Sequence, residues 1–245
     1  MQAIDLNADL GEGSVVDSLL MGLISSANIA CGGHAGDSST MEATVSAAAR
    51  NNVTIGAHPS YPDREGFGRR DIEMDAKSLT EAVISQVESL ATVARGLGQR
   101  VKYLKPHGAL YNRIWSDEIQ ASAVVEAAKS LQLPILGPSG SSVEKIARER
   151  NVGFFREAFI DRQYQNDGTL VSRMKSGAVI RDKNLAADRA VRLTVQQHVE
   201  TADGKRLSLK ADSLCIHSDT EGAVSIAEAV RAKLEVAGVE VRSFL

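Results

Sequence analysis

Short apolar segments alternate with amphipathic segments along most of the chain. The apolar segments lie at residues 4–8, 27–31, 53–57, 101–104, 134–137, 152–156, 213–216 and 239–242, and their length predicts β-strands. Helical spacing and capping signals predict helices over residues 15–24, 40–51, 79–97, 117–131, 182–199 and 221–236. Ser141 and Glu144 form a capping box that predicts one more helix, whereas the turn-rich residues 164–181 fit neither pattern.

This alternation predicts an α/β fold built from parallel βαβ units. Seven or eight such units favour a parallel (β/α) barrel, closed or nearly closed and irregular in places. An open doubly wound sheet is the alternative, but no G-x-G-x-x-G follows the first predicted strand, which argues against a dinucleotide-binding fold. Since no linker-like change of composition interrupts the chain, we expect residues 1–245 to form a single domain.

Composition restricts the classes of partner. The chain has 245 residues, of which 43% are hydrophobic and 24% charged, as in ordinary globular proteins. A net charge of −3 predicts no nucleic-acid partner and no anionic membrane surface, and no apolar run is long enough for a membrane span. The first residues lack a signal-peptide layout, and Cys31 and Cys215 are the only cysteines. We therefore expect a cytoplasmic protein without a structural disulfide.

Four of the five histidines directly follow predicted strands: His34, His58, His107 and His217. The fifth, His198, lies near a predicted helix end, where the helix dipole accommodates its charge. In a parallel barrel the C-terminal strand ends share one face, so the four imidazoles are expected to converge there.

Each of these histidines also has a structural explanation when taken alone. His34 is placed to cap the next helix, His58 to fix the turn before Pro59, and His217 to lie as a hydrogen-bonded group in the core. The common position of all four after strand ends favours a functional cluster.

Carboxylates also gather at predicted strand ends: Asp5 and Asp9 flank the end of the first strand, Glu12 lies in its turn, Asp37 follows His34, Glu157 and Asp161 follow the sixth strand, and Asp219 follows His217. Histidines and carboxylates in one cleft suit general acid–base chemistry, because each shifts the pKa of the other towards neutrality. They also suit a divalent metal. The spacing matches no compact zinc motif such as H-E-x-x-H, so a divalent cation is an open hypothesis.

Basic residues near strand ends are candidates for anion binding. Lys105, after the fourth predicted strand, is placed to hold a carboxylate or phosphate, or to act as a base if its pKa is depressed. A surface lysine is the alternative. Arg64, Arg69 and Arg70 lie in the long polar loop 60–77 and are able to clamp an anion bidentately, although a solvated charged loop explains each of them equally well.

A glycine-rich turn containing Cys31, His34 and Asp37 leads into the helix that starts at the capping box of Ser39 and Glu42. Backbone N–H groups at such a helix start, left uncovered by glycines, predict a local anion site. Cys31 is expected to be a small buried side chain rather than a nucleophile.

Several sequence blocks together resemble the LamB/YcsF family. They are DLNADLGE (5–12), ANIACGGHAGD (27–37), GAHPSYPD (56–63), GFGRR (66–70), KPHGALYN (105–112), EAF (157–159), DR (161–162) and CIH (215–217). The blocks occur in order over nearly the whole chain, so the resemblance is specific. It departs at Gly33, Ile160 and Ser218, where an aromatic residue, alanine and glycine are usual, and these departures remove no acid, base or histidine.

The resemblance implies a barrel related to glycoside hydrolases and polysaccharide deacetylases, and the A subunit of the bacterial ATP-dependent 5-oxoprolinase. In that reaction 5-oxoproline, water and ATP give glutamate, ADP and phosphate, and ATP activates the lactam by phosphorylating its carbonyl oxygen. The enzyme also needs subunits B and C. The chain has no Walker-type G-x-x-x-x-G-K-[ST], so ATP is expected to act through the complex.

The site residues expected from this resemblance form two groups. The catalytic group, which orients water or moves protons, is Asp9, His34, His58, Lys105 and His107. The group that binds substrate or phosphate is Glu12, Asp37, Arg69, Arg70, Glu157, Arg162 and His217.

Two other functions fit the same residues. A metal-dependent deacetylase or amidohydrolase would act alone on a sugar or amide. A non-catalytic subunit would only present the ligand to other chains.

Overall fold

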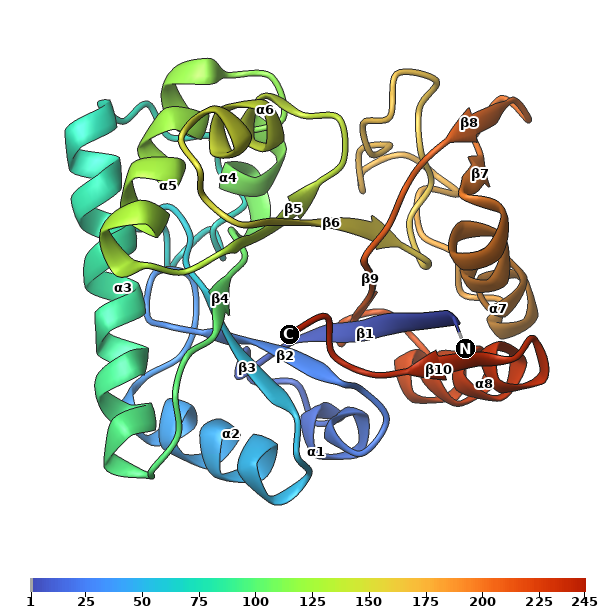
Figure 1. Cartoon of the computed structure of the whole chain (residues 1–245), viewed down its shortest axis with the longest axis horizontal. Helices are drawn as coiled ribbons and strands as arrows, with labels where there is room; N and C mark the ends of the chain where they lie inside the picture. Colours follow the sequence, from blue (N-terminus) through green and yellow to red (C-terminus); the bar gives the residue numbers. More distant parts are fainter. Residues whose placement is uncertain (1) are drawn as a thin grey trace.

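Figure 1 shows the computed structural model, which describes residues 2–245. Among these residues, seven parallel strands form a barrel, and the last of them pairs with both the sixth and the first. The closed parallel α/β barrel predicted from the sequence is confirmed. Its strands are β1 (Gln2–Leu10), β2 (Ser26–Ala30), β3 (Thr54–His58), β4 (Tyr103–Leu104), β5 (Ile135–Pro138), β6 (Phe154–Phe159) and β9 (Ser213–His217).

Helices cover the outside of the barrel (Figure 1). They are α1 (Asp17–Met21), α2 (Ser38–Arg50), α3 (Ala76–Gly96), α4 (Gly108–Arg113), α5 (Glu118–Leu131), α6 (Ser142–Glu149), α7 (Lys183–Val191) and α8 (Ala223–Val236). Within residues 2–245, none of them is long and apolar enough to cross a membrane.

Side-chain caps fix where several helices begin. Ser141 accepts a hydrogen bond from the backbone N–H of Glu144, which confirms the predicted cap of α6. At α2, by contrast, Asp37 accepts from the N–H of Thr40, so the helix begins at Ser38. The predicted capping box of Ser39 and Glu42 is therefore wrong, because a carboxylate two residues earlier already holds the first turn.

The predicted helix 182–199 is too long. Helix α7 passes into a π-helical turn, η1 (Arg192–Gln196), and Gln197 ends it in the left-handed region with φ 53°. The chain then forms an antiparallel pair, β7 (His198–Glu200) with β8 (Arg206–Ser208). His198 consequently lies in a short strand rather than at a helix end.

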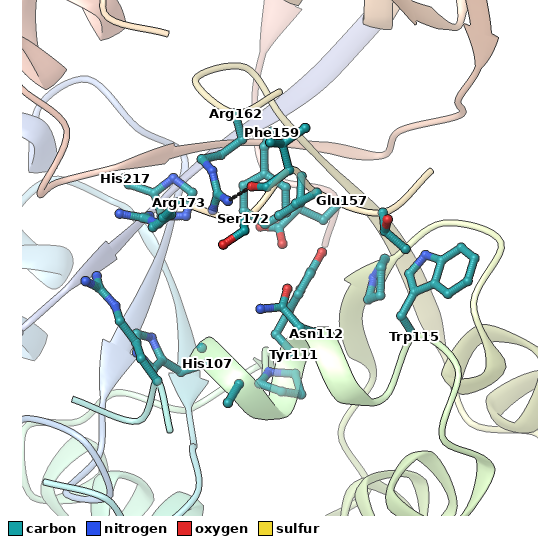
Figure 2. A pocket seen from close by; sticks show the side chains of 18 of the residues that line it. His107, Tyr111, Asn112, Trp115, Glu157, Phe159, Arg162, Ser172, Arg173 and His217 are labelled. Carbon is teal, nitrogen blue, oxygen red and sulfur yellow. Dashed lines mark hydrogen bonds between the residues drawn. The ribbon is translucent and has the colours of Figure 1, made fainter. Parts of the chain in front are cut away.

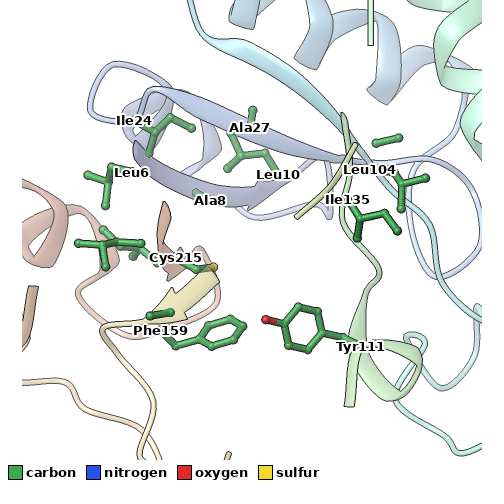
Figure 3. Packing of buried hydrophobic residues seen from close by; sticks show 14 of the residues in the cluster. Leu6, Ala8, Leu10, Ile24, Ala27, Leu104, Tyr111, Ile135, Phe159 and Cys215 are labelled. Atoms are coloured by element: carbon green, nitrogen blue, oxygen red, sulfur yellow. The ribbon is translucent and has the colours of Figure 1, made fainter. Parts of the chain in front are cut away.

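Strand β1 shows how the barrel divides polar from apolar residues. Leu6, Ala8 and Leu10 are fully buried in the hydrophobic core cluster (Figure 3), and each buried leucine contributes roughly 1.5–3 kcal/mol. The alternate residues Asp5, Asn7 and Asp9 face the barrel interior, where they hydrogen-bond to side chains of β2 and β9. The interior is thus a polar network inside an apolar shell.

The C-terminal segment covers the end of the barrel opposite the strand-end histidines. Strand β10 (Val239–Val241) pairs in parallel with the first residues of β1. Phe244 then packs edge-on against Tyr103 and at a tilt against Phe155, with ring centroids 5.1 and 4.4 Å apart.

Asp5 lies at this same end of the barrel and accepts hydrogen bonds from Ser25, Ser26 and Ser213. Asp5 was predicted to flank the end of the first strand. That expectation is wrong, because β1 runs on to Leu10 and Asp5 lies within it.

Candidate functional site

The C-terminal ends of the strands open into a cavity of about 660 Å³, a size common among small-molecule sites. Figure 2 shows side chains converging on it from opposite sides, with His107 and Tyr111 facing Glu157, Arg162 and His217. Glu157 comes from β6 and His217 from β9, whereas Arg162 follows β6 and Tyr111 belongs to α4.

The three histidines that follow β2, β3 and β4 lie together. The rings of His34 and His107 stack with centroids 3.6 Å apart, and His107 Nδ1 is 3.0 Å from His58 Nε2. Glu12 joins them, with its Oε1 2.8 Å from His34 Nε2 and 3.3 Å from His107 Nδ1. The convergence predicted from their strand-end positions is confirmed.

The loop between β3 and α3 packs against this cluster. The carbonyl of Phe67 accepts from His107 Nε2 at 3.0 Å. Gly68, with φ +64°, lies so close that an added Cβ would be 2.9 Å from both His34 Cβ and His107 Cδ2. Only glycine fits here without strain. The long polar loop therefore positions the histidines.

Burial keeps two of the histidines neutral. It lowers the pKa of His34, and it lowers the pKa of His107 well below the usual value with a further contribution from the neighbouring His58 and His34. A neutral imidazole has a lone pair, which a base or a metal ligand requires.

Lys105 lies between two carboxylates at the floor of the cavity. It is 2% exposed, and its Nζ is 2.7 Å from Asp9 Oδ1 and 2.8 Å from Glu157 Oε1. Burial alone would lower the pKa of Lys105, but the two carboxylates raise it well above 10.5. Burial likewise opposes ionisation of Asp9, yet His58 and Lys105 hold its pKa well below 3.8. The suggestion that Lys105 acts as a base through a depressed pKa is wrong, and so is the surface alternative.

A second histidine–carboxylate pair lies across the cavity. His217 Nδ1 is 3.0 Å from Asp161, which also accepts from Thr220. Burial opposes the charge on Asp161, but His217 and these hydrogen bonds lower its pKa. With its Nδ1 directed to Asp161, His217 presents its Nε2 elsewhere and is fixed in one orientation.

Arginines form the cationic rim of the cavity. Asp219 bridges Arg69 and Arg173, at 2.6 and 3.0 Å. Arg162 is buried and donates to the carbonyl of Val171. Burial, together with the nearby Arg173, lowers its pKa to about 10. The rim thus has more positive charge than its own acids require, which favours an anionic ligand.

Some expected residues lie outside the cavity. Asp37 caps α2, and the exposed Arg70 pairs with Asp63 and Glu65. Arg64 donates to the carbonyl of Gly36, so it also has a structural partner.

Cys31 is a buried free thiol whose pKa burial raises to about 12, as expected of a small core side chain rather than a nucleophile.

The cavity is also lined by residues that were not predicted, among them Tyr111, Trp115, Ser172 and Arg173. Tyr111 and Trp115 come from α4 and the turn after it, and Ser172 and Arg173 come from the unassigned segment 164–181 (Figure 2). The Tyr111 hydroxyl and the Trp115 indole N–H are buried without a hydrogen-bond partner within residues 2–245. The KPHGALYN block was the available signal for Tyr111. The other three had none, because they lie in turns without periodicity.

A closed parallel barrel with titratable side chains at its C-terminal mouth defines the class of (β/α)-barrel enzymes. Residues 4–245 match the model of the LamB/YcsF family. The chain belongs to this family.

Known proteins resemble the chain over its full length. A protein of Agrobacterium fabrum, named as an A subunit of 5-oxoprolinase, is 44% identical over 251 residues, covering 100% of this chain and 98% of that protein. The structure of a lactam utilization protein from Thermus thermophilus has a TM-score of 0.92 at 38% identity, covering 98% and 99% of the two chains. A polysaccharide deacetylase of Bacillus cereus has a TM-score of 0.51 at 10% identity, covering 99% and 92%. This last likeness shows the fold alone.

Proposed function

We propose that this chain is the A subunit of an ATP-dependent 5-oxoprolinase, which opens 5-oxoproline to glutamate in the cytoplasm together with subunits B and C. The observation that carries the proposal is its 44% identity, over the full length, to a protein of that name. Two buried free thiols support a reducing compartment.

Lactam opening requires an activated carbonyl, an attacking water and a proton for the ring nitrogen. ATP supplies the activation by phosphorylating the carbonyl oxygen, with the nucleotide bound through the complex. A first water attacks the ring carbon and the C–N bond breaks, which leaves an acyl phosphate; a second water releases phosphate and glutamate. This chain must therefore bind an anionic ligand and move protons.

The cavity offers groups for each task. Lys105, held protonated, is suited to an oxyanion or phosphoryl oxygen, while Arg162 and Arg69 are suited to the carboxylate of the lactam. On one side His58 and His107 orient the attacking water, and on the other His217 is a base oriented by Asp161. Asp37 and Arg70 have no part in this assignment, because one caps a helix and the other is exposed.

Reconstitution with both partner subunits tests the proposal. The complete complex is expected to release glutamate and phosphate from 5-oxoproline and ATP, and His107→Ala is expected to abolish this turnover. Arg70→Ala is the matched control, because that exposed side chain lies outside the cavity. Absence of ATP-coupled turnover in the complete complex, or normal turnover with His107→Ala, refutes the assignment.

A stand-alone amidohydrolase is the second candidate, and the cluster of three histidines and Glu12 favours it. Such an enzyme would hydrolyse amides or acetyl esters without ATP or partners. Activity of the isolated chain on these substrates would replace the first proposal.

A further inference from the structure

The facing nitrogens of His58 and His107 are both left without a proton. His58 Nδ1 is 2.7 Å from the carbonyl oxygen of Lys105, and His107 Nε2 is 3.0 Å from that of Phe67. A carbonyl oxygen only accepts hydrogen bonds, so each ring places an N–H there, and a ring that carries a single N–H has none left for its other nitrogen. The remaining nitrogens, His58 Nε2 and His107 Nδ1, therefore direct lone pairs at one another across 3.0 Å.

Two lone pairs at this distance repel unless a cation lies between them. Glu12 adds a negative oxygen to the same point, with its Oε1 3.3 Å from His107 Nδ1 and 3.8 Å from His58 Nε2. All three side chains line the cavity. The cation is either a shared proton or a metal ion.

We propose that His58 Nε2, His107 Nδ1 and Glu12 Oε1 bind a divalent transition-metal ion of the zinc class, with one coordination position open to the cavity. A tetrahedral zinc ion with ligands at about 2.1 Å separates its ligand atoms by roughly 3.4 Å. The three observed separations of 3.0, 3.3 and 3.8 Å average close to that spacing. A proton shared by the two imidazoles accounts for the 3.0 Å distance alone, and Asp9 Oδ2, 3.3 Å from His58 Nε2, borders the same point.

The surroundings of the cluster are those of a metal site. Histidine ligands in metalloproteins usually donate their second N–H to a backbone carbonyl or a carboxylate, as His58 and His107 do here. His34 takes a supporting place, because its Nε2 lies 2.8 Å from Glu12 Oε1. Two imidazoles and a carboxylate select zinc, manganese, iron or cobalt over magnesium and calcium. An ion held there would polarise a carbonyl or acidify a bound water.

A second group, Asp9, Cys215 and His217, does not support a metal. The ammonium of Lys105 lies 2.7 Å from Asp9 Oδ1 and 3.2 Å from Cys215 Sγ. Its positive charge already occupies the place where an ion would lie. The metal site is therefore assigned to the cluster around Glu12 alone.

Titration of the metal-stripped full-length chain tests the site. Zinc binding by calorimetry and cobalt binding by its visible absorption at pH 8 are expected to reach one ion per chain. His58→Asn and His107→Asn should weaken binding by about 100-fold or more, and His34→Asn by about 10–100-fold. His198→Asn is the matched control and should bind like the wild type, since that histidine lies in β7. Glu12→Gln keeps the shape of the side chain but removes the carboxylate ligand, so it should also weaken binding, and it tests the site if a histidine variant does not fold.

Two results overturn the proposal. One is the absence of saturable binding of zinc or cobalt, which would mean that a shared proton, not a metal ion, lies between the two histidines. The other is binding that persists in His58→Asn, His107→Asn and Glu12→Gln. Because these titrations need neither ATP nor partner subunits, they are judged separately from lactam opening.

Discussion

Replacing Lys105 with methionine removes the ammonium group that contacts both Asp9 and Glu157 at the floor of the cavity. The substitution keeps most of the volume of the side chain and deletes ion pairs of 2.7 and 2.8 Å. Breaking a buried pair from one side costs about 3–5 kcal/mol, because the carboxylates stay behind without compensation. That is a large part of the roughly 5–15 kcal/mol by which a domain is stable.

The loss should depend on pH in a defined direction. In the wild type the low pKa of Asp9 contributes stability that is present above 3.8 and is lost only as the pH falls through the lower folded value. Without the lysine, His58 and His217 are left to oppose the effect of burial, so the pKa of Asp9 rises and its protonation relieves part of the loss of stability. The difference in free energy of unfolding between the wild type and Lys105→Met should therefore become smaller as the pH falls from 8 to 5.

Urea unfolding of both proteins at several pH values measures this difference. Lys105→Met combined with Asp9→Asn and Glu157→Gln is the matched variant, because it removes the carboxylate charges as well and should recover most of the lost stability. A cost below about 1 kcal/mol for the single change, typical of exposed ion pairs, would contradict the reasoning. So would a difference that widens at low pH.

Three further outcomes follow from the same contacts. Gly68→Ala should lower the free energy of unfolding by more than the roughly 1–2 kcal/mol that a left-handed backbone costs alone, because the added Cβ meets two histidines. Gly13→Ala is the control in urea unfolding: Gly13 has φ +85° with open space around it, so this variant measures the backbone cost by itself. Burial raises the pKa of Asp5 to about 6, so the folded protein loses stability as the pH rises from about 4 to 6. Asp5→Asn should remove this loss of about 3 kcal/mol. An unchanged dependence of the free energy of unfolding on pH would contradict the prediction. Arg173→Ala should raise KM for 5-oxoproline about tenfold with little change in kcat, and an equal fall of kcat would show a different role.

The sequence predicted the site where strand order alone determined position. His34, His58 and His107 lie at or just after the C-terminal ends of three successive strands of a parallel barrel. Because these strand ends share one face, the three side chains lie close together. Lys105 was singled out for the same reason. Its protonation state was not predictable, since that depends on Asp9 and Glu157 arriving from other strands.

The residues whose place was not predicted are positioned by tertiary contacts, which the pattern of hydrophobic and polar residues along the sequence does not reveal. Arg173 lies in a turn-rich segment whose path is set by isolated bridges, Arg162 with Val179 and Tyr164 with Leu170. Asp37 was expected to bind substrate because it follows a glycine-rich turn. Its carboxylate instead accepts a hydrogen bond from the backbone N–H of Thr40 and caps α2. Local hydrogen bonds of this kind compete with function for the same residue types.

The pairing of β9 with β1 makes the order of synthesis matter. The first strand leaves the ribosome early, yet the partner that completes the ring is Ser213–His217, and Phe244, which contacts Tyr103 and Phe155, follows later still. Contacts so distant in sequence form slowly. A nascent chain therefore leaves the polar face of β1 without its β9 partner until Ser213–His217 has been synthesised.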